Sequence, residues 1–408
     1  MERRIENPSK YLGNELTYIE RVLRSQSWSS TSGSWCQTLE SEFARKMNAE
    51  YAVAMNSGTS TLHAALEAVG VGFGDEVISP ALTVIMDTTA TLHANAIPVY
   101  ADVDADTFNI DVNDVARKIT ARTKAILAVS LYGLPCDLQP LRDLADERGI
   151  ALIEDNAQCV LSEYRGRMVG SWGHVASWSF ENTKHLSAGE GGMVTTDSEE
   201  LAVAMRKIGG HGFKNLQADE GRVRLNDDVF QDPDYKRHDV LGWNYRMPEF
   251  TAAIALAQLE RVEELVELRR MAAGHLLAVM ADCPFLTPQE CPPDRTNSFY
   301  TLGVRYNSDA AGGLSWREFR RLYLQEGGDG IYGAWSVPYL EPVMAERTFA
   351  ARLPALYADV SYEPGLCPVA ERIQPEIMQF KTNYRDPSIA QARAEALART
   401  IAKVQRSA

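Results

Sequence analysis

The chain has 408 residues, of which 45% are hydrophobic and 24% are charged, a composition typical of a globular protein with a full core. Its formal net charge is −14 and no block of Lys or Arg stands out, which argues against nucleic-acid binding. No apolar run approaches the roughly 18 residues that span a bilayer, and the N-terminus lacks the apolar region of a signal peptide, so we expect a soluble cytoplasmic protein that contacts no membrane.

The six cysteines are scattered along the chain, without a CxxC pair or a His/Cys spacing typical of metal sites. Scattered cysteines in a chain of this size are typical of a reducing compartment, which again favours the cytoplasm. We therefore expect no metal site.

Short apolar runs alternate with amphipathic stretches between about residues 50 and 210. The pattern predicts strands at 51–55, 75–80, 97–103, 124–130, 150–156, 174–180 and 192–197, and helices at 59–70, 84–95 and 137–149. Strand, helix and strand in this order predict an α/β fold, with a mostly parallel sheet and helices on both faces.

The second half of the chain is organised differently. Residues 211–240 are polar and aperiodic, and they predict a long loop that is either functional or loosely ordered. Residues 247–280 keep a helical period, and they predict one long helix or two joined helices. Prolines and cysteines near 283–293 indicate a boundary, after which a strand at 298–306 and a helix at 315–328 indicate a smaller α+β domain.

The sequence NSGTSTLHAAL (56–66) follows a predicted strand and opens a predicted helix. Gly58 would let the backbone approach a ligand closely, Thr59 offers a hydroxyl, and the first amides of a helix are free to bind an anion. The alternative is simple capping of the helix by Ser57 or Thr59, which is common at helix starts.

Two further segments carry candidate chemistry. IALIEDNAQ (150–158) ends a predicted strand with Asp155 and Gln158, at the edge of a parallel sheet where ligands bind. Lys184 follows another predicted strand and precedes a glycine-rich turn. Taken singly, the carboxylate could cap a helix and the lysine could be solvated. Together, an anion site, a buried carboxylate and a lysine are what pyridoxal phosphate (PLP) requires.

At these segments the chain resembles the DegT/DnrJ/EryC1/StrS family of PLP-dependent aminotransferases, over about residues 12–375. The matching blocks are NSGTSTLHAAL, GDEVISPALT, IEDNAQ, SFENTKHLSAGEGG and GWNYRMPEFTAAIALAQLE. The resemblance implies the type I aminotransferase fold, with a large PLP-binding α/β domain that we place at 12–260 and a small C-terminal α+β domain at 261–408. It also implies a homodimer whose active sites are shared by both subunits.

The resemblance assigns roles position by position. Lys184 corresponds to the Schiff-base lysine, Asp155 to the partner of the pyridine nitrogen, and Gln158 to the residue against the ring or its phenolic oxygen. The phosphate would be held by Gly58, Thr59 and Ser179, with Asn244 reaching it from the neighbouring subunit. Asn182 is a further candidate for cofactor contact, and His185 for substrate contact.

The sequence departs from its relatives at two places. Val84 stands where many relatives carry an aromatic residue that stacks on the cofactor ring, and SLYGLP (130–135) replaces the frequent HLYGQP. Some relatives carry histidine at the reactive position and catalyse a dehydration. Alignment on Ser179 and the downstream GEGG places Lys184 there, with His185 next to it, which favours amine transfer.

The implied reaction moves an amine from a donor, which we expect to be glutamate, to a keto-sugar, which we expect to be linked to a nucleotide. Lys184 would act as base and then acid, and the kinetics should be ping-pong. The open alternatives are a cyclitol or a free or phosphorylated keto-sugar as acceptor. A PLP-dependent dehydratase and a PLP-binding regulator rank below these.

Overall fold

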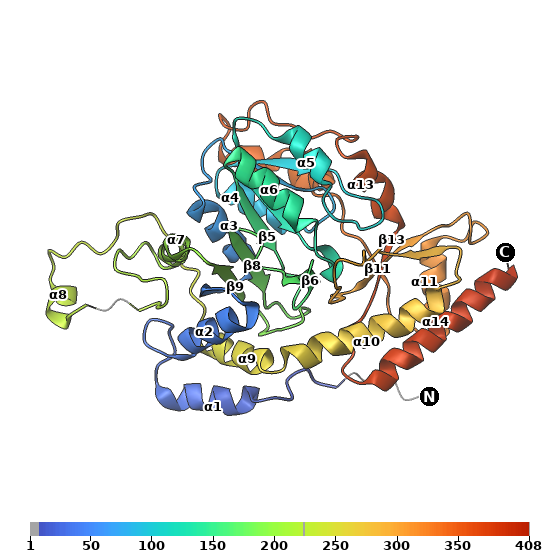
Figure 1. Ribbon diagram of the computed structural model, residues 1–408, viewed down its shortest axis with the longest axis horizontal. Helices are drawn as coiled ribbons and strands as arrows, with labels where there is room; N and C mark the ends of the chain where they lie inside the picture. Colours follow the sequence, from blue (N-terminus) through green and yellow to red (C-terminus); the bar gives the residue numbers. More distant parts are fainter. Residues whose placement is uncertain (1–7, 223–224, 408) are drawn as a thin grey trace.

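The computed structural model describes residues 8–222 and 225–407, which form two main sheets connected by long helices, together with a small two-stranded sheet (Figure 1). The larger sheet has seven strands in the order β1-β9-β8-β5-β4-β2-β3. Its strands are β1 (Tyr51–Met55), β2 (Glu76–Pro80), β3 (Ile97–Ala101), β4 (Thr123–Val129), β5 (Ala151–Asp155), β8 (Val175–Ser179) and β9 (Gly192–Thr196). Strand β9 alone runs opposite to the other six strands, so the predicted mostly parallel sheet is confirmed.

Helices cover both faces of this sheet. Helices α2 (Trp35–Met47), α6 (Leu138–Arg148) and α9 (Glu249–Leu259) pack on one face, and α3 (Gly58–Ala68), α4 (Met86–His93) and α7 (Glu199–Gly209) on the other. The alternation of β4 shows why both faces are apolar: Ile126 contributes to the first core and Leu127 to the second.

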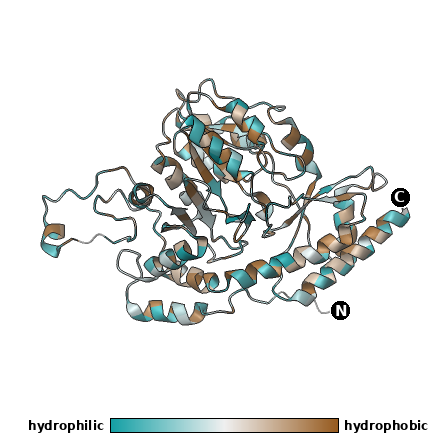
Figure 2. Cartoon of the chain, in the orientation of Figure 1, coloured by the Kyte–Doolittle hydropathy of each residue, from teal (hydrophilic) through white to brown (hydrophobic). Residues whose placement is uncertain are grey.

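The smaller sheet is antiparallel, in the order β10-β11-β13-β12, with bounds Leu286–Pro288, Leu302–Tyr306, Ile377–Phe380 and Tyr332–Gly333. It shares a core with α10 (Val262–Met280), α11 (Trp316–Gln325) and α14 (Pro387–Ser407). Figure 2 shows hydrophobic and hydrophilic residues alternating along α10 and α14, as expected for helices with one buried face. The predicted helical stretch is thus two joined helices, α9 and α10. The domain boundary placed between residues 260 and 261 lies at this joint and remains a prediction.

The remaining elements are short or peripheral. They are α1 (Glu15–Ser25), α5 (Val112–Lys118), α8 (Asp227–Gln231), α12 (Pro342–Ala345), α13 (Pro368–Ile373), β6 (Glu163–Tyr164) and β7 (Arg167–Met168). None of the helices within residues 8–222 and 225–407 is long and apolar enough to cross a bilayer.

The described parts of the predicted 211–240 loop, residues 211–222 and 225–240, extend away from both main sheets and include α8 (Figure 1). Its two ends are joined at the base, where Phe213 and His238 form an isolated antiparallel bridge. Gly212 has φ +75°, and a Cβ there would lie 1.9 Å from the carbonyl oxygen of Val240. Only glycine therefore fits where the loop leaves the domain.

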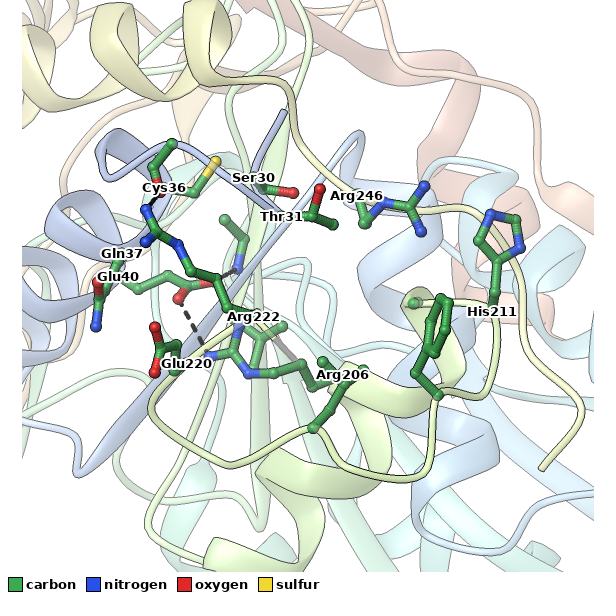
Figure 3. Close-up of a pocket in the computed structure, with 18 of the residues that line it drawn as sticks. Ser30, Thr31, Cys36, Gln37, Glu40, Arg206, His211, Glu220, Arg222 and Arg246 are labelled. Carbon is green, nitrogen blue, oxygen red and sulfur yellow. Dashed lines mark hydrogen bonds and ion pairs between the residues drawn. The ribbon is translucent and has the colours of Figure 1, made fainter. Parts of the chain in front are cut away.

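Two side chains form hydrogen bonds with the backbone of the edge strand β1. Arg206 of α7 and Glu40 of α2 form a buried ion pair at 3.0 Å, beside a cavity of about 630 Å³ (Figure 3). Glu40 also accepts from the amide of Ala54 at 2.8 Å, and Arg206 donates to the carbonyl of Ala52 at 3.2 Å. These bonds occupy outward-facing backbone groups that an edge strand otherwise exposes to another strand.

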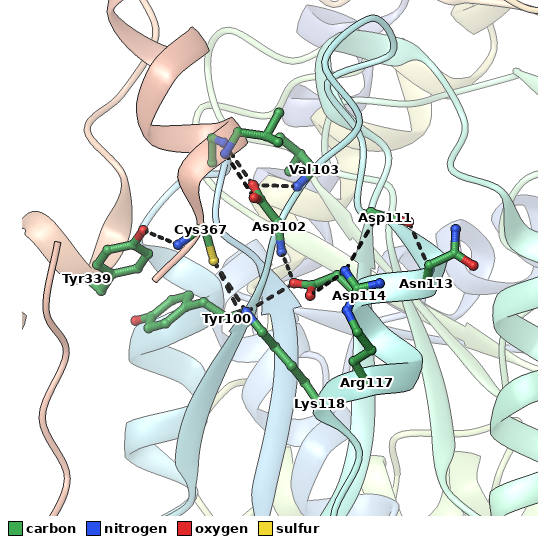
Figure 4. Close-up of polar contacts among 12 residues, drawn as sticks. Tyr100, Asp102, Val103, Asp111, Asn113, Asp114, Arg117, Lys118, Tyr339 and Cys367 are labelled. Carbon is green, nitrogen blue, oxygen red and sulfur yellow. Dashed lines mark hydrogen bonds and ion pairs between the residues drawn. The ribbon is translucent and has the colours of Figure 1, made fainter. Parts of the chain in front are cut away.

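The opposite edge of the sheet, β3, is covered by the segment around α13 (Figure 4). Asp102, just after β3, accepts from the amides of Val369 and Ala370 at 2.9 and 2.8 Å. Nearby, the amide of Cys367 donates to the hydroxyl of Tyr339 at 3.0 Å. The carboxylate thereby caps the first turn of α13 and fixes this segment to the large sheet.

Candidate active site

The start of α3 forms a cradle against the end of β8. Ser57 caps the helix by accepting from the amide of Ser60 at 3.1 Å. No group among the described residues accepts from the amides of Gly58 and Thr59. A Cβ at Gly58 would lie only 2.9 Å from the Cβ of Ser179. Two free amides and a serine hydroxyl therefore lie together, packed so closely that a single added methyl group would not fit, an arrangement suited to a phosphate.

The two carboxylates at the end of β5, Glu154 and Asp155, lie on different faces of the sheet. Glu154 accepts from the amides of Gly170, Trp172 and Gly173 at 2.6, 2.8 and 2.7 Å, so it holds the turn before β8. Asp155 is 3% exposed and accepts from the amide of Ala157 at 2.8 Å. This alternation leaves Asp155, and not Glu154, available to the candidate site.

The electrostatic surroundings of Asp155 connect it to Lys184. Burial raises the pKa of Asp155, whereas the Ala157 amide and the positive charge of Lys184 act in the opposite direction. The side chain of Gln158 is also buried, and its Oε1 accepts from the amide of Tyr132 at 3.0 Å. The predicted lysine and carboxylate therefore belong to one cluster, and Gln158 lies one turn beyond it.

Lys184 lies in the turn after β8 and faces an aromatic ring from the smaller sheet domain. Its amide donates to the carbonyl of Glu181 at 3.0 Å, and its Nζ lies 4.6 Å from the centre of the Tyr300 ring. The hydroxyl of Tyr300 is 2.7 Å from Oγ1 of Thr183. Tyr300 thus contacts both the reactive side chain and the residue before it.

A buried arginine on α10 holds this turn in place. Arg269 is 3% exposed and donates to the carbonyls of Thr183, Lys184 and Tyr300 at 2.7, 3.2 and 2.5 Å. Burial, together with the charge of Arg385, lowers the pKa of Arg269 to about 9. Neither Arg269 nor Tyr300 was predicted from the sequence, because both come from segments more than 80 residues further along the chain.

The DegT/DnrJ/EryC1/StrS aminotransferase family matches residues 12–383 of this chain. The chain belongs to this family. It is 35% identical over 278 residues to the GDP-perosamine synthase of Vibrio cholerae, covering 68% of this chain and 71% of that protein. It is 37% identical over 308 residues to the L-glutamine:2-deoxy-scyllo-inosose aminotransferase of Streptoalloteichus tenebrarius, covering 73% and 70%. The X-ray structure of the aminotransferase from Psychrobacter cryohalolentis superposes with a TM-score of 0.84, at 30% identity and 98% coverage of both chains.

The chain is therefore a PLP-dependent aminotransferase, and its fold is that of the aminotransferases it resembles. The cradle at Gly58, the buried Asp155 and the neighbouring Lys184 fit the phosphate, the ring nitrogen and the aldehyde of that cofactor.

Two predicted residues beside Lys184 in this aminotransferase have partners within the chain. Oδ1 of Asn182 accepts from Nζ of Lys10 at 2.8 Å, and Lys10 also donates to Ser187 at 2.9 Å. His185 is 1% exposed, and its Nε2 lies 2.9 Å from the carbonyl of Ser298, to which it donates. Burial lowers the pKa of His185 well below its ordinary value, so the ring is neutral at physiological pH. Contact of either residue with cofactor or substrate remains a prediction.

Asn244 is the one predicted phosphate contact assigned to a neighbouring subunit. It is exposed, its carbonyl accepts from the side chain of Asn56 at 3.3 Å, and its neighbours Tyr245 and Arg246 line the cavity beside β1. The lining of that cavity includes neither Lys184 nor Asp155. Contact of Asn244 with a phosphate therefore remains a prediction.

Replacing Gly58 by alanine should weaken PLP binding about tenfold. The added Cβ would force the start of α3 away from Ser179, and overpacking of this kind costs about 1–3 kcal/mol. Titration of the apoenzyme with PLP, followed by absorbance, measures the effect. Gly72→Ala is the matched control, because a Cβ there meets no atom within 4 Å. Equal affinities of the two variants would contradict a phosphate site at Gly58.

Proposed function

We propose that this aminotransferase transfers the amino group of glutamate to a nucleotide-linked keto-sugar, with Lys184 as the residue that binds the cofactor covalently. The observation that carries the proposal is the cluster in which Lys184 lies within electrostatic range of the buried Asp155. A lysine at this position, where dehydrating relatives carry histidine, favours amine transfer. The keto-sugar is proposed because the relatives include several GDP-perosamine synthases.

When bound, PLP supplies an aldehyde that accepts amines and a ring that stabilises negative charge on the adjacent carbon. The free amides of Gly58 and Thr59, with the hydroxyl of Ser179, would hold its phosphate. Asp155 would keep a proton on the ring nitrogen, and Gln158 would lie against the ring or its phenolic oxygen.

Lys184 would also move the proton of the reaction. Its Nζ, once free, removes the α-proton of the donor and returns it to the neighbouring carbon, so that one amine serves first as base and then as acid. The contacts of Arg269 with the carbonyls of Thr183 and Lys184 support this role, because they limit the movement of the turn while the side chain exchanges partners. The Tyr300 ring limits the directions in which Nζ can turn.

The active site belongs, in this proposal, to a homodimer in the cytoplasm. Asn244 would reach the phosphate in the partner subunit, and Asn182 and His185 would contribute on the cofactor and substrate sides of the turn. The exposure of Asn244 supports this assignment, since an exposed side chain is available to a second subunit. The adjoining cavity would then lie close to the partner's active site.

A cyclitol is the second candidate acceptor. It is favoured by the 37% and 36% identity to two L-glutamine:2-deoxy-scyllo-inosose aminotransferases. Because those names give glutamine as donor, both amino acids belong in the assay.

The test runs amine transfer in reverse, which transamination permits. The purified enzyme, loaded with PLP, is incubated with 2-oxoglutarate and GDP-perosamine, and formation of glutamate is followed by mass spectrometry. We expect glutamate to appear and initial-rate plots to be parallel, as ping-pong kinetics require. A second, separate assay uses 2-deoxy-scyllo-inosose as acceptor and glutamate or glutamine as donor. Conversion of the cyclitol alone would replace the sugar assignment, and intersecting plots would contradict the mechanism.

A further inference from the structure

A second carboxyl group lies behind Asp155. Asp87, in the first turn of α4, is 0% exposed, and its Oδ2 accepts from Oγ1 of Thr83 at 2.8 Å. Its side chain lies close enough to that of Asp155 for each carboxyl group to act on the ionisation of the other. No N–H or O–H group of the described residues donates to the other oxygen, Oδ1. Two buried carboxyl groups this close cannot both be ionised at low cost, so the pair must hold a proton.

The surroundings of the two groups decide which of them holds it. Asp155 accepts from the Ala157 amide and lies near the positive charge of Lys184, and both favour its ionised form. At Asp87 the Thr83 hydroxyl and the residue's own backbone also favour the ionised form, but no cation is among the largest influences on its pKa. Burial, reinforced by the charge of Asp155, raises the pKa of Asp87 well above its ordinary value.

We propose that Asp87 is a positioning residue, a neutral carboxylic acid whose Oδ1 donates a hydrogen bond to Asp155. This inference rests on the proposed role of Asp155 as the partner of the cofactor's ring nitrogen. Asp155 then receives one bond from Ala157 and one from Asp87, which fixes its plane and keeps it ionised for the ring nitrogen. Thr83 in turn orients Asp87, so three side chains in series set the direction of one carboxylate.

Asparagine at position 87 is the matched substitution. Its carbonyl can accept from Thr83 while its amide donates to Asp155, so it keeps both hydrogen bonds and cannot ionise. We expect Asp87→Asn to bind PLP within about threefold of the wild-type affinity. Asp87→Ala removes the donor and should bind about tenfold more weakly or worse, as expected for the loss of a bond to a charged group. Should the alanine variant not fold, Thr83→Val removes the orienting hydroxyl instead and should weaken binding at least threefold.

The protonation of Asp87 is tested by measuring how the unfolding of the apoenzyme depends on pH. Asp87 has a raised pKa in the folded state, so above the ordinary pKa of aspartate the native pair keeps a proton that the unfolded chain releases. The free energy of unfolding therefore falls as pH rises above that ordinary range. The unfolding constant of the wild type, relative to that of Asp87→Asn, should therefore increase as pH rises above the ordinary range of aspartate, by at most about tenfold per pH unit. This dependence requires no cofactor and would not arise from packing alone.

The outcomes separate this inference from the proposed function. A ratio of unfolding constants that does not change with pH would overturn the neutral Asp87. Equal weakening of PLP binding in the asparagine and alanine variants would overturn the hydrogen bond to Asp155. A pH-dependent ratio, combined with unchanged PLP affinity in every variant, would leave the shared proton in place but overturn the positioning role of Asp87.

Discussion

Lys184→Ala should lower the rate of amine transfer by about four orders of magnitude and yield protein without covalently bound PLP. The loss is large because one side chain provides both the covalent attachment and the proton transfer, and positioned proton transfer alone contributes about 10²–10⁴-fold. Rates are measured with saturating PLP and glutamate. Attachment is mapped by reduction with borohydride and peptide mass spectrometry, which should identify the peptide that contains residue 184.

Two further lysine variants make the result specific. Lys184→Arg keeps a positive charge near Asp155 and the Tyr300 ring, but its guanidinium is a poor base and forms no stable link to an aldehyde. It should be as inactive as the alanine variant. Lys124→Ala removes an exposed lysine of β4 and should retain full activity. Activity of Lys184→Arg above one hundredth of the wild type would show that charge, and not covalent chemistry, is what position 184 supplies.

The large sheet could be predicted because its strands are buried on both faces. Such strands are short apolar runs that end at turn residues, and the seven predicted strands match the observed ones to within two residues at each end. The same logic located the candidate site. Asp155 was placed at the end of β5 and Lys184 after β8, and neighbouring parallel strands bring their carboxyl ends together.

The break between α9 and α10 gave no comparable signal. It falls at Glu260 and Arg261, without the glycine or proline that usually ends a helix. The small sheet was largely missed, since β10 and β12 have only three and two residues and depend on the strands that they pair with.

The supporting residues of the site were missed for a different reason. Asp87 and Arg269 occur in stretches with helical period, where a charged residue normally faces solvent. Each is buried because of what another segment brings to it: the Asp155 carboxyl in one case, and three backbone carbonyls in the other. Contacts of this kind depend on how helices are placed against strands, and local sequence pattern does not contain that information.

Arg206→Met should destabilise the protein more than any other substitution considered so far, by about 3–5 kcal/mol. It leaves Glu40 buried without its partner, since both side chains are at most 8% exposed. It also removes the donor to the carbonyl of Ala52. Thermal unfolding of the apoenzyme measures the loss. The exposed pair of Arg24 and Glu20 provides the control, because Glu20→Ala should change stability by about 0–1 kcal/mol.

The double variant Arg206→Met/Glu40→Leu should recover part of this loss. It removes both charges together, but the amide of Ala54 then has no partner, which costs about 1–3 kcal/mol. Because β1 leads directly into the cradle at Gly58, we also expect PLP affinity to fall in Arg206→Met and to recover partly in the double variant. A single variant as stable as Glu20→Ala would mean that the ion pair does not hold the edge strand, and the cradle would then depend on the β1–β9 pairing alone.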